Sequence, residues 1–137
     1  MEDMAILSIC LDTNILIDTL RGDEETVKRI KEIETSGNIL STTTINAFEL
    51  YYGAEKTEKR ERNKEAVRKL LERLLIYDFT EKASERAGEI AANLEAEGKT
   101  IDFRDIFIGA TALINESTIF TKDINHFERI PHLKLQV

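Results

Sequence analysis

The chain has 137 residues, of which 42% are hydrophobic and 33% are charged. This length suits one domain with one substantial core, and the hydrophobic share excludes a disordered chain. The formal net charge of −7 argues against a simple basic coat for nucleic acid.

The sequence predicts a soluble, cytoplasmic protein without a membrane span. A lone cysteine, Cys10, excludes a disulfide framework within the chain and suits a reducing cytosol. The first four residues include two acids, whereas a signal peptide begins with basic residues. No apolar run approaches the roughly 20 residues that a membrane helix needs.

Short apolar segments alternate with longer amphipathic segments along the chain. In chain order they predict a strand at 5–11, helices at 14–21 and 24–36, a strand at 39–42, helices at 45–54 and 59–74, a strand at 75–79, helices at 81–97 and 103–115, and strands at 118–121 and 133–137. Thr44 and Thr80 are expected to cap the helices that follow them.

Strands that alternate with helices require crossover connections, and these produce a parallel sheet with helices on both faces. We therefore expect an α/β fold, a single domain over residues 1–137, with a central, mostly parallel sheet of four to five strands. Ligands of such sheets bind beyond the carboxyl ends of the strands. Polar residues at those ends are therefore the candidates for function.

Two aspartates follow predicted strands. Asp12 comes directly after the first strand, and Asp123 follows the fourth. Each also has a structural interpretation, because aspartate is favoured at helix N-caps and in turns. Neither residue alone decides between the two roles.

Glu49 is the only charged residue between positions 40 and 54. Its predicted helix is otherwise apolar or small, so we expect the carboxylate to be at least partly buried. A buried carboxylate needs a partner or a metal ion. The alternative is a glutamate that faces solvent on the polar edge of an amphipathic helix.

Asp102 and Asp105 precede a helix that is apolar nearly all round, which predicts a central position. Capping by Asp102 and a favourable helix dipole at Asp105 explain one acid well and the second less well.

The four acids at positions 12, 49, 105 and 123 are expected to converge at one edge of the sheet, with Glu49 and Asp105 in the first turns of their helices. Clustered carboxylates raise one another's pKa values or bind cations. Ligation by oxygen alone suits Mg²⁺ or Mn²⁺. The one cysteine and the two histidines do not have the spacing of a zinc site.

Four segments carry these acids in a set order. They are residues 11–18 (LDTNILID), 43–54 (TTINAFELYYGA), 105–110 (DIFIGA) and 121–123 (TKD), the last followed by Phe127 and residues 130–135. In order and spacing they resemble the motifs of the PIN-domain nucleases, most closely the VapC-type toxins of toxin–antitoxin pairs. The resemblance covers essentially the whole chain.

The resemblance implies a metal-dependent endoribonuclease of the cytoplasm, in which a water molecule activated by Mg²⁺ or Mn²⁺ hydrolyses RNA phosphodiesters. The catalytic residues and metal ligands that it implies are Asp12, Glu49, Asp105 and Asp123. It also implies a VapB-type antitoxin as partner and a homodimer.

The resemblance assigns the orientation of these carboxylates to hydrogen bonds from Thr13, Asn14 and Thr121. Two positions depart from the family pattern. Gly109 stands where alanine is more usual, and Asp102 is an additional acid beside Asp105.

Residues 56–73 hold eight Lys or Arg and four Glu. One interpretation is a helix that contacts RNA phosphates. The other, which we favour, is a solvated face with ion pairs between successive turns.

Three other functions are consistent with parts of the sequence. A receiver-like signalling module would use Asp78 and the Thr121-Lys122 pair, but it needs an acidic pair after the first strand and leaves Glu49 without a role. A non-catalytic PIN-like binding module usually lacks the acids, and all four are present. A PIN-domain RNA-processing nuclease would share the fold and the metal site, so these alone do not separate it from a toxin.

Overall fold

The computed structural model describes residues 6–136. The first residue of the first predicted strand and the last residue of the fifth lie outside this range. The strands are β1 Ser8–Leu11, β2 Ile39–Thr43, β3 Leu75–Tyr77, β4 Thr118–Phe120 and β5 Leu135–Gln136. The helices are α1 Thr13–Leu20, α2 Glu24–Thr35, α3 Thr44–Glu55, α4 Arg60–Leu71, α5 Glu81–Ala96, α6 Phe103–Ile114 and α7 Ile124–Phe127.

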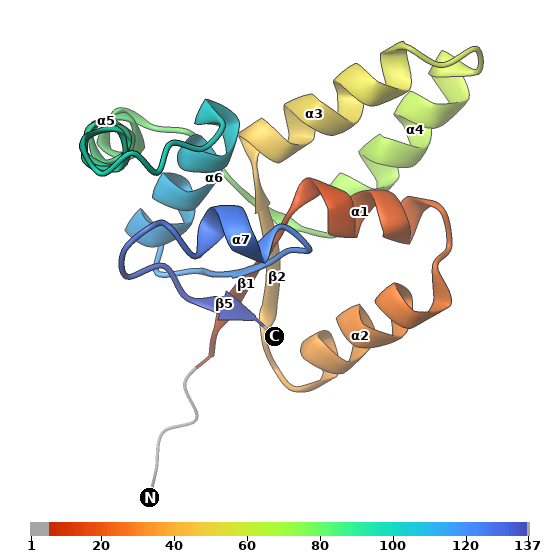
Figure 1. Ribbon diagram of the computed structural model, residues 1–137. Coiled ribbons are helices and arrows are strands. Elements are labelled where there is room, and N and C mark those ends of the chain that lie inside the picture. The colour runs from red at the N-terminus through yellow and green to blue at the C-terminus, as the bar shows by residue number, and fades with distance from the viewer. Residues whose placement is uncertain (1–5, 137) are drawn as a thin grey trace, which may run out of the picture.

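The five strands form one sheet in the order β3-β2-β1-β4-β5 (Figure 1). All the strand pairings within the described residues are parallel, so the predicted α/β architecture is confirmed. The first strand is central, and the chain builds the sheet outward from it in both directions. The point where this direction reverses lies between β1 and β4, which is where ligands bind in open α/β sheets.

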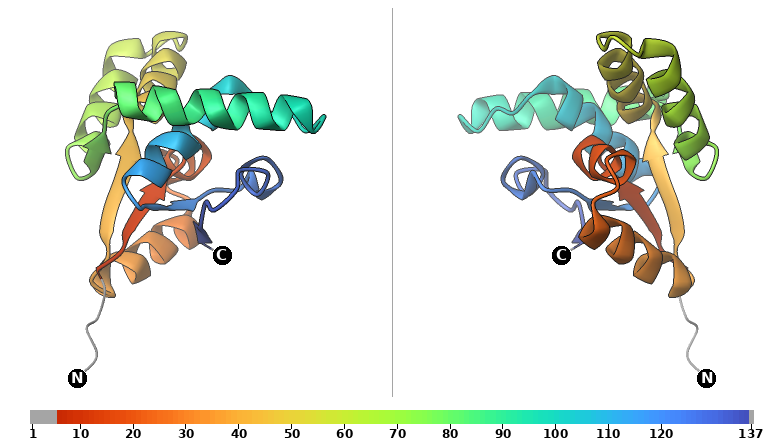
Figure 2. Two further views of the ribbon diagram at one scale, coloured as in Figure 1. Left: turned by 90° about the vertical axis from the view of Figure 1, so that its left-hand side faces the viewer. Right: turned by 90° about the vertical axis from the view of Figure 1, so that its right-hand side faces the viewer.

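Alternate residues of β1 face opposite sides of the sheet and divide the interior into two cores. Ile9 and Leu11 pack with apolar side chains of α1 to α4, whereas Cys10 packs with those of α5, α6 and α7. The two groups of helices therefore lie on opposite sides of the strands (Figure 1). In the side views, the strand arrows point toward the end of the molecule where α3 and α5 lie (Figure 2).

The start of α3 differs from the prediction by one residue. The N-cap is Thr43, whose hydroxyl accepts a hydrogen bond from the backbone of Asn46, while the Asn46 side chain accepts one from the backbone of Thr43. This reciprocal arrangement satisfies two donors at once. The predicted cap, Thr44, is wrong, because its hydroxyl instead accepts from the backbone N–H of Phe79 at 3.2 Å.

The short helix α7 was not predicted, since one turn is too short to produce a helical pattern of apolar residues. The other predicted helices and strands are present with ends shifted by a few residues. Within residues 6–136, none of the helices is both long and apolar enough to cross a bilayer.

The basic residues of α4 are partly neutralised by neighbouring acids. Lys64 lies within ion-pair distance of Glu55 and Glu61, and Arg68 pairs with Glu65. These contacts support the interpretation of α4 as a solvated, ion-paired face.

Helix α6 lies against the segment that follows α7, and Gly109 is at the contact. A Cβ atom at this position would lie 2.5 Å from Cδ1 of Ile130, which is itself buried. Glycine at position 109 therefore leaves room for the Ile130 side chain opposite it.

We predict that Gly109→Ala is more favourable in an Ile130→Val background than in the wild type, by about 0.5–1.5 kcal/mol in the free energy of unfolding. Alanine stabilises the helix relative to glycine, and valine lacks the Cδ1 atom that alanine would meet. Urea denaturation of the two single variants and the double variant measures this difference. Additive effects would contradict the contact.

The N-cap of α5 provides a second prediction. The exposed Thr80 hydroxyl accepts from the backbone N–H of Ala83 at 3.1 Å, as the sequence predicts. Thr80→Ala should lower the free energy of unfolding by about 1 kcal/mol, because that donor loses its partner. Thr80→Ser keeps the acceptor and should change stability by much less; equal losses in both variants would refute the capping role.

Candidate functional site

Asp12 lies at the carboxyl end of the central strand and is only 4% exposed. It occupies the N-cap position of α1, but its side chain makes no capping hydrogen bond. Its Oδ1 accepts from Nδ2 of Asn46 at 3.0 Å, and its Oδ2 accepts from Oγ1 of Thr121 at 2.6 Å. The capping interpretation of Asp12 therefore fails, and its carboxylate is held by side chains from two other elements.

Burial raises the pKa of Asp12 to about 6. The hydrogen bond from Thr121 opposes this rise, whereas the negative charges of Asp105 and Glu49 add to it. Two of the other candidate acids are thus near enough to Asp12 to disfavour its ionised form. A cation among these acids would reverse that effect.

Glu49 is the sixth residue of α3, so it lies in the second turn of the helix. The predicted position in the first turn is wrong. Its side chain is 21% exposed. Oε1 accepts from Oγ1 of Thr13 at 2.6 Å, and Oε2 lies 3.4 Å from Nη1 of Arg104. Glu49 is therefore partly buried and partnered, and the solvent-facing alternative does not describe it.

The two acids at the start of α6 have different roles. Asp102 caps the helix, since its Oδ1 accepts from the backbone N–H of Arg104 at 2.8 Å. Asp105 lies in the first turn, and its Oδ2 is 2.9 Å from Nδ1 of His126. Burial raises the pKa of Asp105, and the hydrogen bond with His126 opposes the rise. Capping thus accounts for Asp102 but not for Asp105, which remains a candidate metal ligand.

Asp123 follows β4 and makes no capping hydrogen bond to α7. Its Oδ2 accepts from Nδ2 of Asn14 at 3.2 Å. Its backbone N–H donates to Oγ1 of Thr121 at 2.9 Å, the same hydroxyl that donates to Asp12. The ends of β1 and β4 are thereby joined through one threonine.

The predicted orienting residues each contact a different carboxylate. Thr13 donates to Glu49, Asn14 to Asp123 and Thr121 to Asp12. Asn14 also accepts from the backbone of Lys122, which fixes its amide between the two strand ends.

Sequence reasoning gave no role to Asn46, Arg104 or His126. Asn46 is fully buried and donates to both Asp12 and Thr13. The available signal was its place three residues after Thr43, at the start of an apolar helix. Arg104 stands between two acids, and His126 is three residues beyond Asp123, but neither spacing by itself predicts a contact.

The four acids face one end of the sheet without forming a ready metal cage. Within residues 6–136, no group of three or more Asp, Glu, His or Cys side chains is already close enough to hold an ion. Two of the acids instead pair with basic side chains, Glu49 with Arg104 and Asp105 with His126. The four acids offer only carboxylate oxygens, and two of these acids already attract basic side chains. Such a set of donors fits a hard divalent cation.

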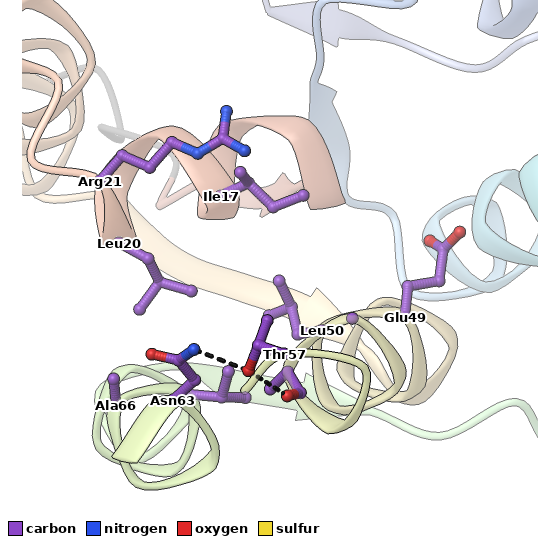
Figure 3. A pocket seen from close by; sticks show the side chains of 11 residues that line it. Ile17, Leu20, Arg21, Glu49, Leu50, Thr57, Asn63 and Ala66 are labelled. Carbon is purple, nitrogen blue, oxygen red and sulfur yellow. Dashed lines mark hydrogen bonds between the residues drawn. The ribbon is translucent and has the colours of Figure 1, made fainter. Parts of the chain in front are cut away.

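A groove of about 350 Å³ opens beside the acids, between α1, α3 and α4. Figure 3 shows Glu49 at one end of it and Leu20 toward the other, with the hydrogen-bonded pair Thr57 and Asn63 along one side. Ile17, Leu20 and Leu50 contribute apolar surface to the groove. The groove is thus continuous with the candidate site.

The receiver-like alternative does not fit this arrangement. Asp78 is exposed beyond β3, an edge strand two positions from β1, and Lys122 forms an ion pair with Asp18. The residues that this alternative requires are therefore not gathered in one pocket.

Comparison with known proteins identifies the family. The model of the PIN domain matches residues 9–133. Ribonuclease VapC2 of Rickettsia felis is 32% identical over 92% of this chain and 94% of its own length. The tRNA(fMet)-specific endonuclease VapC of Salmonella typhimurium is 31% identical over 96% of this chain and 98% of its own.

Solved structures agree with the sequence relatives. The crystal structure of VapBC2 from Rickettsia felis, bound to a DNA fragment from the promoter, contains a chain that superposes with a TM-score of 0.87 at 31% identity. The alignment covers 95% of this chain and 98% of that one. DNA-bound VapBC from Salmonella typhimurium gives a TM-score of 0.86 at 30% identity, over 96% and 98% of the two chains. This chain therefore belongs to the PIN-domain family and, within it, to the VapC ribonucleases.

Proposed function

We propose that residues 1–137 form one PIN-like nuclease domain that hydrolyses RNA phosphodiesters, with a divalent cation held by Asp12, Glu49, Asp105 and Asp123. The observation that carries this proposal is their arrangement at the reversal point of the sheet. Each carboxylate has a hydrogen-bonding partner from this chain: Asn46 and Thr121 at Asp12, Thr13 at Glu49, His126 at Asp105 and Asn14 at Asp123.

The cation is Mg²⁺ or Mn²⁺, because the proposed ligands are carboxylate oxygens, which suit these hard ions better than zinc. When bound, it lowers the pKa of a water molecule and neutralises charge on the phosphoryl group. The chain's own hydroxyls and amides keep the carboxylates in place before the ion arrives. This reduces the reorganisation that binding requires.

Water is the proposed nucleophile. The only thiol, Cys10, is buried on the α6 side of the sheet, and burial raises its pKa above the usual range. The hydroxyls of Thr13 and Thr121 donate their protons to carboxylates, which orients them as supports for the site. The chain's own residues thus position the water and the phosphate and do not form a covalent intermediate.

The toxin of a VapBC-type pair is the biological role that we propose. The relatives are named as ribonucleases or as a tRNA(fMet)-specific endonuclease, and the solved relatives are VapBC complexes. RNA processing outside a toxin–antitoxin pair is the second candidate. The non-catalytic alternative is disfavoured, because all four acids are present and partnered.

The cognate partner is a VapB-type antitoxin, and the groove lined by Ile17, Leu20 and Leu50 is a surface suited to an apolar segment that ends near Glu49. A homodimer is also part of the proposal. It is supported by the stacked pair Phe48 and Tyr52, which are 56% and 51% exposed on α3. We also propose a cytoplasmic location, which is supported by the RNA substrate class and by the lone cysteine, Cys10.

Metal-dependent cleavage is the first prediction for the site. Mixed structured RNA should be cleaved in Mg²⁺ or Mn²⁺ and not in EDTA, and Asp105→Asn should lower the rate by at least about 100-fold, since a charged ligand becomes a neutral one. The products are expected to carry 5′-phosphate and 3′-hydroxyl ends. Gel analysis of end-labelled RNA measures both properties.

Asp102→Asn is the matched control for that experiment. Asparagine is as good an N-cap as aspartate, so this variant should retain most of the activity. Equal losses in Asp102→Asn and Asp105→Asn would show that the assay reports damage to α6 and not loss of a ligand.

Stability in EDTA gives a second prediction for the site. Burial favours the protonated form of Asp12 in the folded chain, so its contribution to the free energy of unfolding falls as pH rises from about 4 to 6 and stays low above 6. Asp12→Asn removes the buried charge and should raise stability at pH 7 by about 1–3 kcal/mol.

Mn²⁺ should make the wild type the more stable of the two proteins. It should raise the melting temperature of the wild type and leave that of Asp12→Asn nearly unchanged. Thermal denaturation with and without Mn²⁺ measures both effects. A wild type that is more stable than the variant in EDTA would contradict the electrostatic account of Asp12.

A further inference from the structure

Arg104 is one of three residues at the candidate site to which the family resemblance assigns no role. It is the second residue of α6 and stands between Asp102 and Asp105 in the sequence. Its guanidinium is half exposed and spans two acids: Nη1 lies 3.4 Å from Oε2 of Glu49, and Nε lies 3.3 Å from Oδ1 of Asp102. The side chain therefore links α6 to α3 across the opening of the site.

The pairing engages both oxygens of the Glu49 carboxylate. One oxygen of its carboxylate accepts from Thr13, and the other faces Arg104. The contact with Thr13 is neutral and orients the carboxylate, whereas Arg104 brings a positive charge to the other oxygen. A divalent cation bound at Glu49 would be repelled by that charge.

Arg104 can move without disturbing the helix. Its backbone N–H is fixed by the capping carboxylate of Asp102, but its side chain is 50% exposed. A planar guanidinium released from Glu49 is well suited to bind a phosphate through two parallel hydrogen bonds. Its tether at the start of α6 keeps it within reach of any phosphate near Asp105.

We propose that Arg104 is a positioning residue that occupies Glu49 while no cation is bound, is displaced by the arriving cation, and then binds a backbone phosphate of the RNA. The proposal rests on the proposed function, since it takes Glu49 as a metal ligand. A purely structural ion pair between α3 and α6 would affect stability alone. The proposed exchange instead predicts opposite effects on affinity for the metal ion and for RNA.

Calorimetric titration with Mn²⁺ tests the first half of the exchange. Arg104→Gln should bind Mn²⁺ roughly three- to tenfold more tightly than the wild type, because the competing charge is gone. Arg104→Lys keeps a positive charge and should remain near the wild type. Arg68→Gln is the matched control: Arg68 is 51% exposed and also pairs with a glutamate, but on α4, so its loss should leave Mn²⁺ affinity unchanged.

Steady-state cleavage at saturating Mg²⁺ tests the second half. Arg104→Gln should raise KM for RNA roughly three- to tenfold, with a smaller change in kcat, because a phosphate contact is lost while the metal ligands remain. Circular dichroism checks that the variants are folded. Arg104→Met keeps the aliphatic stem without the charge and gives the same comparison if Arg104→Gln does not fold.

The outcomes separate this proposal from the one on which it rests. If the wild type binds Mn²⁺ and Arg104→Gln binds it equally or less tightly, the exchange is refuted and the metal site stands. If KM is unchanged in Arg104→Gln, the phosphate contact is refuted. If the wild type binds no Mn²⁺, the metal site itself is wrong, and the role of Arg104 falls with it.

Discussion

The burial of the Asp12 carboxylate at the end of the central strand is the constraint around which the site is arranged. A carboxylate that is 4% exposed must be hydrogen-bonded or neutralised. Thr121 at the end of β4 and Asn46 at the start of α3 supply the hydrogen bonds. Because these donors lie just beyond the two strands that flank β1, the requirements of one charge fix how the strand ends and the start of α3 lie together.

The same residues serve local structure and the site. Asn46 completes the cap of α3 with its Oδ1 and holds Asp12 with its Nδ2. Thr121 accepts from the backbone of Asp123 and donates to Asp12. Arg104 and His126 partner two of the acids, so the cost of gathering carboxylates is partly offset within the chain.

The architecture and the candidate acids could be predicted because each leaves a local mark on the sequence. Alternating apolar and amphipathic segments indicate the parallel sheet, and Glu49 stands alone in an uncharged stretch. The contacts of Asn46, Arg104 and His126 could not be predicted, because they depend on how α3, α6 and α7 meet in space. The N-cap of α3 was misplaced by one residue because Thr43 and Thr44 have equal capping propensity, and tertiary contact with Phe79 engages the second of them.

The candidate acids come from the end of β1, from α3 and α6 and from the segment after β4, and these elements pack in both cores of the molecule. Local folding of either layer of helices brings together only part of the set. A chain that has formed β1 to α4 holds Asp12 and Glu49 without their counterparts from the other layer, and Asp12 then lacks its donor from Thr121. The proposed catalytic arrangement is therefore a property of the completed fold, so we expect a partly synthesised or partly unfolded copy of this nuclease to be harmless to the RNA around it.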